Sequence, residues 1–555
     1  MSTAPLRTSP QATAAPRDRG DACPGSLRLH AADDGALARV RVPGGVLSAG
    51  QAEALAGAAH RLGDGDLHLT SRGNVQLRGL GDGCGADLAA LLGAAGLLPS
   101  AAHERVRNVV ASPLSGLDGR GLYDVRPWLT ALDAALCASA AARELSGRFL
   151  FALDDGRGDV AALDADVTVR AAADGRAVLS LDGAGPALRV PAADAPRAAL
   201  LAAEAFAHCV RASGAGAWRV AELASGPGEL LREVRRRLAA EGIAYEEFDL
   251  GGAAGGAGAE GTGAAEGTGA EATPASGAEA AGAEGTPRAG AEAAGAGGTG
   301  AEGVPTEGAE AEGTGAGAEG AHAAGAERTQ AEGTPAARAG AGAAGAGPER
   351  TGAAGTRAAT VADGAAAASP SRTTAPPVPG PPLGIVGSAL SVHAPLGRLT
   401  LPQWRELIRT AAALGPGELR LTPWRGVVVP VPGAEQDRAA EGLDRLAATG
   451  LVTGPASPWP RVGACAGRPG CAKSRADVRA DAARTLAAAS GANLPLYWSG
   501  CERRCGHPRG DRVDLVAAPG GGYHLTAVRQ GRASDPVPLA DPTRLATALA
   551  AIGPV

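Results

Sequence analysis

The sequence predicts an α+β fold in which a β-α-β half-domain occurs twice, with each copy followed by an α/β unit. The first observation is an internal repeat, since Pro43–Thr70 aligns without a gap with Pro395–Thr422 at an offset of 352 residues. The second is a change of composition, because Gly251–Pro382 consists mainly of Ala, Gly, Glu, Thr and Pro. The third is that strand-like alternation and helical patterns follow each copy. The predicted parts are a disordered N-terminus (1–27), a first half-domain (28–100), a first α/β unit (101–250), a linker (251–382), a second half-domain (383–455) and a second α/β unit (456–555).

The repeat predicts the same element order in both copies. Ser48 and Thr400 occupy matching positions and are typical helix N-caps. We expect each to begin a helix that ends at a glycine-bearing turn, and a strand to follow over Asp66–Leu80 and Glu418–Val431. Duplicated halves commonly pair about a pseudo-twofold axis, so the repeat also predicts a groove between the copies.

The linker is predicted to be disordered. It contains no Phe, Trp or Tyr, so it cannot bury enough apolar surface to offset the entropy of its chain. Its 15 acidic residues and six arginines give a net charge of −9, against −6 for the whole chain. The remaining parts therefore carry about +3, a mildly basic balance that favours an anionic ligand.

The two α/β units show matching strand and helix patterns. Asp166–Leu181 alternates around Asp174-Gly175, which predicts a hairpin, and Arg512–Ala527 has the same layout. Helical periodicity predicts four helices in these units. They are Pro196–Ser213, Pro227–Glu241, Ala476–Ser490 and Asp541–Ile552.

Four of the eight cysteines have the spacing of metal ligands. Cys465 and Cys471 form C-x5-C, and Cys501 and Cys505 form C-x3-C, each pair within glycine and proline. A set of thiolates suits zinc or an iron–sulfur cluster. Structural zinc usually has a tighter C-x2–4-C knuckle, so the wider loop favours a four-iron cluster. The single cysteines at 23, 84, 137 and 209 indicate no disulfide framework and are expected to be free thiols.

A polar row is predicted on the strand of the first copy. Alternation with period two places Arg72, Asn74, Gln76 and Arg78 on one face. Guanidinium groups match carboxylate geometry, so this face is a candidate anion-binding surface, although a solvated polar face has the same pattern. In the second copy, Trp424-Arg425-Gly426 has lost most of this polarity, so we expect only the first copy to bind an anion.

Several classes of protein are disfavoured. Met1–Arg19 lacks an apolar segment, and no run of about 18 apolar residues occurs elsewhere, so neither a signal peptide nor a membrane span is expected. Matches to GxGxxG inside the linker reflect its composition and predict no dinucleotide site. No feature indicates a nucleic-acid partner. The expected location is the cytoplasm.

Several motifs together resemble the nitrite and sulfite reductase superfamily. They are the order of the parts, the Thr-x-Arg-x-Asn segment at 70–74, Arg107-Asn108-Val109, and C-x5-C followed by Ser-Gly-Cys-x3-Cys. Within the superfamily, Ala464–Cys471 and Cys505-Gly-His-Pro508 are most similar to the precorrin-3B synthase family. The resemblance covers both flanks of the linker. It implies two paired ferredoxin-like half-domains and a monooxygenase that hydroxylates precorrin-3A with dioxygen and forms a lactone in aerobic cobalamin biosynthesis.

The resemblance also implies cofactors and residue roles. A 4Fe-4S cluster would be held by Cys465, Cys471, Cys501 and Cys505, beside a mononuclear non-haem iron, with electrons derived from NADH through a separate donor protein. Arg72 and Arg107 match arginines that contact tetrapyrrole carboxylates or the reacting ligand, and Arg148 occupies the place of a lysine. The sequence itself shows no set of ligands for the second iron; His507, beside the cluster motif, is the one histidine that we nominate.

Two other functions stay open. The first is a sirohaem-dependent sulfite or nitrite reductase, although Leu150 stands where sulfite reductases place a second active-site lysine. The second is a tetrapyrrole carrier or electron-transfer module without catalysis.

Overall fold

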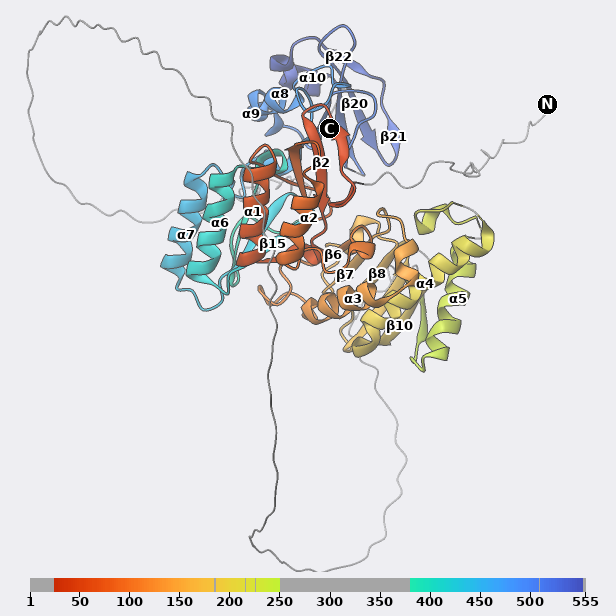
Figure 1. The fold of residues 1–555 in the computed structure, drawn as a ribbon. Coiled ribbons are helices and arrows are strands. Elements are labelled where there is room, and N and C mark those ends of the chain that lie inside the picture. The colour runs from red at the N-terminus through yellow and green to blue at the C-terminus, as the bar shows by residue number, and fades with distance from the viewer. Residues whose placement is uncertain are drawn as a thin grey trace, which may run out of the picture. The chain divides into compact units, whose positions relative to one another are not determined.

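The computed structural model describes residues 24–183, 186–214, 216–224, 226–249, 380–508 and 510–552 (Figure 1). The predicted linker lies outside the described residues except for 380–382. Most of the predicted N-terminal segment, Cys23 included, also lies outside them.

The repeat helices begin and end at matching positions. Helix α1 spans Ala49–Leu62 and α6 spans Leu401–Leu414, the same boundaries shifted by 352 residues. Ser48 accepts a hydrogen bond from the backbone of Gln51, whose side chain accepts one from the Ser48 backbone, so the N-cap is closed in both directions. Thr400 donates its backbone N–H to Gln403 in the same way, at 2.9 Å. Both predicted N-caps are confirmed.

Each predicted strand after a repeat helix is a hairpin of two strands. In the first copy these are β4 (Leu67–Leu69) and β5 (Val75–Leu80), and in the second β15 (Glu418–Leu421) and β16 (Gly426–Pro430). The prediction of single strands over 66–80 and 418–431 was therefore wrong. A tight turn separates the members of each pair, closed in the first copy by Thr70, which donates its N–H to the Asn74 carbonyl.

The half-domains exchange a short strand with each other. The two five-stranded sheets have the orders β1-β2-β5-β4-β14 and β12-β13-β16-β15-β3, so β3 of the first copy completes the second sheet and β14 of the second copy completes the first. Both exchanged strands pair antiparallel, with Leu47 opposite Leu419 and Leu399 opposite Leu67. The remaining bounds are β1 (His30–Ala32), β2 (Gly35–Val40), β3 (Val46–Ser48), β12 (Gly384–Val386), β13 (Ala389–His393) and β14 (Arg398–Leu399).

One hydrophobic core serves both half-domains. Leu55 of α1 and Leu407 of α6 belong to the same buried cluster, and the two helices lie side by side (Figure 1). Trp404 is fully buried and donates its indole N–H to the Ala52 carbonyl at 2.8 Å, across the boundary between the copies. The predicted pairing is confirmed, but the groove expected between the copies is filled on this side by apolar side chains. Helices α2 (Gly85–Ala94) and α7 (Gln436–Ala448) pack on α1 and α6, respectively.

The first α/β unit is a six-stranded sheet with the order β11-β10-β9-β8-β7-β6. Strands β6 to β8 are parallel, and the others are antiparallel, including the predicted hairpin β8–β9. Its core contains residues from the sheet and from α3, α4 and α5. The bounds are β6 (Val109–Ala111), β7 (Phe151–Asp154), β8 (Val167–Ala171), β9 (Arg176–Leu181), β10 (Pro186–Pro191), β11 (Glu246–Asp249), α3 (Arg126–Ala138), α4 (Ala195–Ser213) and α5 (Gly226–Ala240).

The second α/β unit repeats this arrangement. Strands β17 to β19 are parallel, the β19–β20 hairpin is antiparallel as predicted, and β21 and β22 both pair with β20. The helix predicted over 476–490 is divided into two. The bounds are β17 (Val462–Ala464), β18 (Leu496–Ser499), β19 (Arg512–Ala517), β20 (Tyr523–Arg529), β21 (Arg532–Ala533), β22 (Val537–Leu539), α8 (Val478–Arg484), α9 (Leu486–Ala489) and α10 (Leu545–Ala551).

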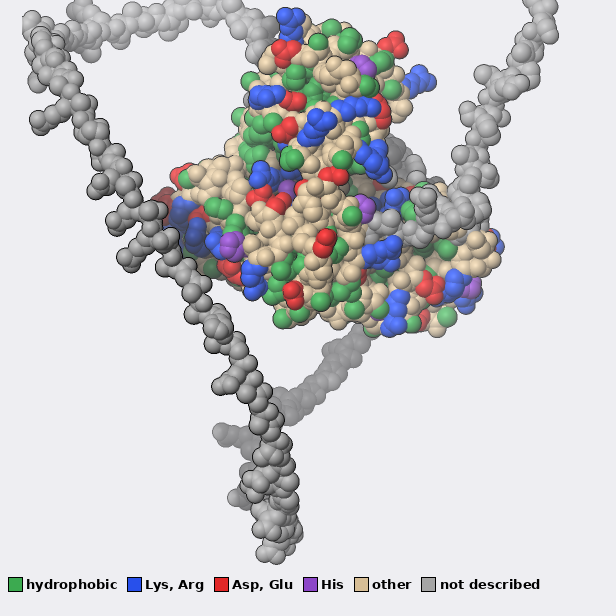
Figure 2. Space-filling view, turned by 45° about the horizontal axis from the view of Figure 1, so that its top comes forward, with side chains coloured by type: hydrophobic (Ala, Val, Ile, Leu, Met, Phe, Trp, Pro, Cys, Tyr) green, Lys and Arg blue, Asp and Glu red, His purple; other side chains and the backbone are tan. Residues whose placement is uncertain are grey.

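No helix in the described part of the chain is both long and apolar enough to span a membrane. On the face drawn in Figure 2, basic and acidic side chains are interspersed rather than gathered into patches of one sign.

Candidate functional site

The two cysteine pairs meet at one edge of the second α/β sheet. Cys465 directly follows β17, and Cys501 follows β18 after one residue. These strands are parallel neighbours, so their carboxyl ends lie at the same edge, where ligands of open α/β sheets commonly bind. Cys471 and Cys505 lie on the loops that continue from these ends. Cys505 is exposed, and the other three thiols are partly buried.

The four thiols lie within electrostatic range of one another. Burial raises the pKa of the Cys505 thiol, and the neighbouring charge of Arg503 opposes this shift. The other three cysteines raise the same pKa further, because a thiolate at Cys505 would be repelled by theirs.

The backbone around the cysteines is fixed by hydrogen bonds. The Gly500 N–H donates to Cys465 Sγ at 3.2 Å, and Arg479 Nε donates to the Cys465 carbonyl at 3.2 Å. The Tyr497 hydroxyl donates to the Cys505 carbonyl at 2.6 Å. Hydrogen bonds to the sulfurs of a cluster are among the factors that set its reduction potential.

The spacing of the thiols fits a cluster better than zinc. Tetrahedral zinc with Zn–S bonds of about 2.3 Å would hold its sulfurs about 3.8 Å apart. In the described residues, three or more Cys, His, Asp or Glu ligand atoms come within 4.8 Å of one another in two places, and neither includes a cysteine. A four-iron cluster binds each thiolate to a different iron, so it does not require three sulfurs to lie this close to one another. When bound, such a cluster supplies electrons one at a time.

Arg78 joins the first half-domain to the cysteine loop. Its guanidinium forms a bidentate pair with Asp34, at 2.8 and 2.7 Å, and also donates to the Gly470 carbonyl at 2.8 Å. The Ala472 N–H donates to the Asp33 carboxylate alongside. Arg78 was predicted to bind substrate, and in the structure its Nε and Nη2 donors hold Asp34 and the loop that precedes Cys471.

A buried polar network connects the first half-domain to the first α/β unit. Asn108 Oδ1 accepts from Asn74 Nδ2 at 3.3 Å and from Arg41 Nη1 at 3.2 Å. Arg41 also donates to the Gly147 carbonyl, and Asn108 Nδ2 to the Phe149 carbonyl, both at 2.9 Å. The network fixes the backbone next to three arginines. Asn74 lies two residues after Arg72, Asn108 follows Arg107, and Gly147 and Phe149 flank Arg148.

Sequence reasoning missed Arg41 and gave Asn108 no role. Arg41 is 3% exposed and directly follows β2, which carries no motif, so its position gave no signal. Asn74 is also buried: its side chain is 1% exposed, and its Oδ1 accepts the Val42 N–H at 2.9 Å. Asn74 was predicted to bind substrate, and the contacts that the structure gives its side chain are to Val42 and Asn108.

The other predicted residues have separate surroundings. Arg72 lies in the turn before β5, so it is not part of a strand row, and only Gln76 and Arg78 share a face of β5. Arg107 is 5% exposed and forms a bidentate pair with Asp133, at 2.7 Å for both contacts. Arg148 is exposed, with its guanidinium 4.8 Å from the ring centre of Trp218. The continuous row of four polar side chains was therefore wrongly predicted.

Replacing Asn108 with alanine should lower the free energy of unfolding by about 3 kcal/mol, because buried donors on Arg41 and Asn74 would lose their acceptor. Thermal or urea unfolding measures the loss. The exposed Asn493 supplies the control, and Asn493→Ala should change stability by about 0.5 kcal/mol or less. Equal effects of the two changes would contradict the network.

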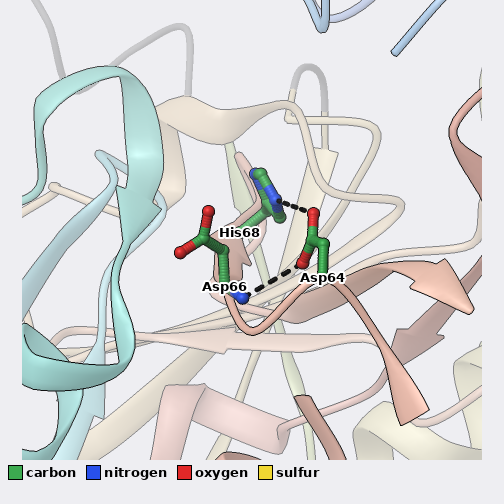
Figure 3. Close-up of side chains that lie close together, drawn as sticks. All are labelled: Asp64, Asp66 and His68. Atoms are coloured by element: carbon green, nitrogen blue, oxygen red, sulfur yellow. Dashed lines mark hydrogen bonds and ion pairs between the residues drawn. The ribbon is translucent and has the colours of Figure 1, made fainter. Parts of the chain in front are cut away.

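The described residues do not offer a suitable site for a second iron. Asp64, Asp66 and His68 lie together (Figure 3), with His68 Nε2 3.7 Å from Asp64 Oδ2. Arg398 already pairs with Asp66 at 2.5 Å. Burial lowers the pKa of His68, and the charges of Arg479 and Arg78 lower it further, whereas Asp64 raises it. Three guanidiniums make this position unfavourable for a divalent cation.

The remaining candidates for that iron fit no better. The second acidic group consists of Asp154, Asp155 and Asp159. The carboxylate of Asp154 accepts three backbone N–H groups, so it holds its own loop closed. His507, our nominated ligand, is exposed, and its Nδ1 lies 2.8 Å from the Arg504 carbonyl.

Comparison with known proteins finds a matching family model and two groups of relatives. The nitrite/sulfite reductase ferredoxin-like half domain matches residues 30–95 and 386–446. Ferredoxin–nitrite reductase of Synechococcus elongatus is 35% identical over 127 residues, which is 22% of this chain and 25% of that protein. Precorrin-3B synthase of a Sinorhizobium species is 34% identical over 165 residues, which is 30% of this chain and 35% of that protein. The chain therefore matches well under two thirds of each of these relatives.

A solved structure extends the likeness of fold to both flanks of the linker. The NirA protein of Mycobacterium tuberculosis superposes with a TM-score of 0.55 at 16% identity, covering 92% of this chain and 79% of that one. Both half-domains are thus similar to the nitrite/sulfite reductase ferredoxin-like half domain, and the chain has relatives among both the nitrite reductases and the precorrin-3B synthases.

Proposed function

We propose that this protein is a precorrin-3B synthase-like monooxygenase, which hydroxylates precorrin-3A and forms a lactone in aerobic cobalamin biosynthesis. The observation that carries the proposal is Leu150, which occupies the place of the second active-site lysine of sulfite reductases. Leu150 is 3% exposed and packs in an apolar cluster with Val110 and Ala152. A buried leucine can deliver no proton to a sulfur or nitrogen oxyanion, whereas hydroxylation of a carbon does not need a lysine there.

The reaction takes one oxygen atom from dioxygen into the substrate and reduces the other to water, which requires two electrons and two protons. We propose that the electrons come from NADH through a separate donor protein and enter through a cluster on the four cysteines. Arg78 and Asp34 hold the cysteine loop against the first half-domain, so the substrate surface and the electron source keep a fixed relation.

Arg72 and Arg148 remain our candidates for contact with the tetrapyrrole carboxylates, together with Gln76. Arg148 is exposed, and Arg72 and Gln76 are partly exposed, so each can reach a ligand. Arg107 already pairs with Asp133, so we assign it a positioning role: it anchors the backbone next to Asn108.

The alternative is a sirohaem-dependent sulfite or nitrite reductase. It is favoured by the match to the Synechococcus enzyme and by 37% identity over 92 residues to ferredoxin–nitrite reductase of Leptolyngbya laminosa.

A visible spectrum of the protein, purified from cells that make sirohaem, separates the two. We expect a broad brown iron–sulfur absorption without sirohaem bands. Strong sirohaem bands that persist through purification would contradict the proposal and favour the reductase.

A further inference from the structure

Arg425 occupies a backbone conformation that suits glycine. It lies in the turn between β15 and β16 with φ +60°, and the equivalent residue in the first copy is Gly73, with φ +66°. A side chain destabilises this left-handed conformation, and residues held in it cluster at functional sites. The second copy therefore carries an arginine where its backbone alone would favour glycine.

Two glycines leave room for the Arg425 side chain to reach the cysteine loop. A Cβ at Gly397 would lie 2.7 Å from Arg425 Cδ, and a Cβ at Gly463 would lie 3.1 Å from Arg425 Nη1. Gly463 is in β17, two residues before Cys465. The guanidinium thus lies against the strand that delivers the first cysteine.

In the part of the chain that the structure describes, neither Arg425 nor Arg479 has a carboxylate partner. Within the described ranges, the Arg425 side chain makes no hydrogen bond or ion pair, and Arg479 makes one hydrogen bond, to the Cys465 carbonyl. Their neighbours differ, since Arg78 pairs with Asp34 and Arg398 with Asp66. Arg479 Nε lies 3.2 Å from the Cys465 carbonyl oxygen, and the Arg425 guanidinium lies against Gly463 two residues earlier, so both cations approach the end of β17.

We propose that Arg425 and Arg479 form a binding site for a carboxylate of the tetrapyrrole, beside the Cys465 loop. A carboxylate there would accept hydrogen bonds from both guanidiniums. The inference rests on the proposed function for the class of ligand, a tetrapyrrole with several carboxylates.

The test uses uroporphyrin, a stable tetrapyrrole polycarboxylate, titrated into the cluster-loaded full-length protein while porphyrin fluorescence is followed. Arg425→Gln should weaken binding about tenfold to hundredfold, as expected when a charge-assisted contact is lost. Arg409→Gln is the matched control, because it removes the same charge from α6 of the same half-domain, where Arg409 is exposed and pairs with Glu406. The control should bind like the wild type.

A second variant separates ligand binding from folding. Arg425→Gly should weaken uroporphyrin binding as much as Arg425→Gln, yet raise the midpoint of thermal unfolding, because glycine relieves the left-handed backbone. Unchanged affinity in both variants would overturn the proposal. Loss of the iron–sulfur absorbance in Arg425→Gln would overturn it too, since the residue would then serve the cluster.

Phosphate competition tests the ligand class. A site for a tetrapyrrole carboxylate predicts that millimolar phosphate displaces little uroporphyrin, and complete displacement would overturn the assignment in favour of a small inorganic anion. If the wild type binds uroporphyrin through Arg425 but does not hydroxylate precorrin-3A, the proposed function fails and this inference stands.

Discussion

Replacing any one of Cys465, Cys471, Cys501 or Cys505 with serine is expected to remove the iron–sulfur absorbance and abolish turnover. Each thiolate supplies one bond to the metal centre, and the four are brought together from the ends of two parallel strands. The loss should therefore be nearly complete for each cysteine, including the exposed Cys505. Absorbance, iron and sulfide content, and activity measure it.

Serine at the other described cysteines is the control. Cys84 precedes α2, Cys137 lies in α3 and Cys209 is buried in α4, all outside the second α/β unit. These variants should keep the colour of the wild type. A full cluster signal in Cys505→Ser would contradict the assignment of the four ligands.

Gly45→Ala is expected to prevent the half-domains from pairing. Gly45 directly precedes the exchanged strand β3 with φ +73°, and a Cβ there would lie 1.9 Å from the Leu421 carbonyl oxygen of β15. Both segments at this close approach are backbone, so neither can move aside without breaking the β3–β15 pairing. We expect insoluble protein, or protein without a cooperative thermal transition.

Gly65→Ala separates this clash from backbone strain. Gly65 has φ +87°, but a Cβ there would have no atom within 4 Å. The variant should fold and lose about 1–2 kcal/mol of stability. Similar melting curves for the two variants would mean that the close approach of the copies does not matter for folding.

The sequence predicted the elements that depend on local patterns. The boundaries of α1 and α6 followed from Ser48, Thr400 and the glycines at the end of each repeat helix, because capping acts within a few residues. The β8–β9 hairpin followed from Asp174-Gly175 for the same reason. The spacing of Cys465 and Cys471 predicts a shared site with Cys501 and Cys505, which the serine variants test.

Contacts between distant segments could not be predicted in this way. Nothing local in Val46–Ser48 shows that it completes the sheet of the other copy, since either sheet would accept its alternation. The bond from Arg78 to Gly470 joins residues 392 positions apart, so periodicity could only place Arg78 on a strand face. Arg425 did leave a signal, because the repeat aligns it with Gly73, a position where glycine is favoured for its backbone.

The proposed hydroxylation is tested most directly by product analysis. Purified protein with its cluster is incubated with precorrin-3A, dioxygen and a low-potential electron donor, and the product is examined by mass spectrometry. We predict a product heavier by one oxygen atom that carries a lactone and takes its label from ¹⁸O₂. Unchanged precorrin-3A, with sulfite or nitrite reduced by the same preparation, would contradict the account.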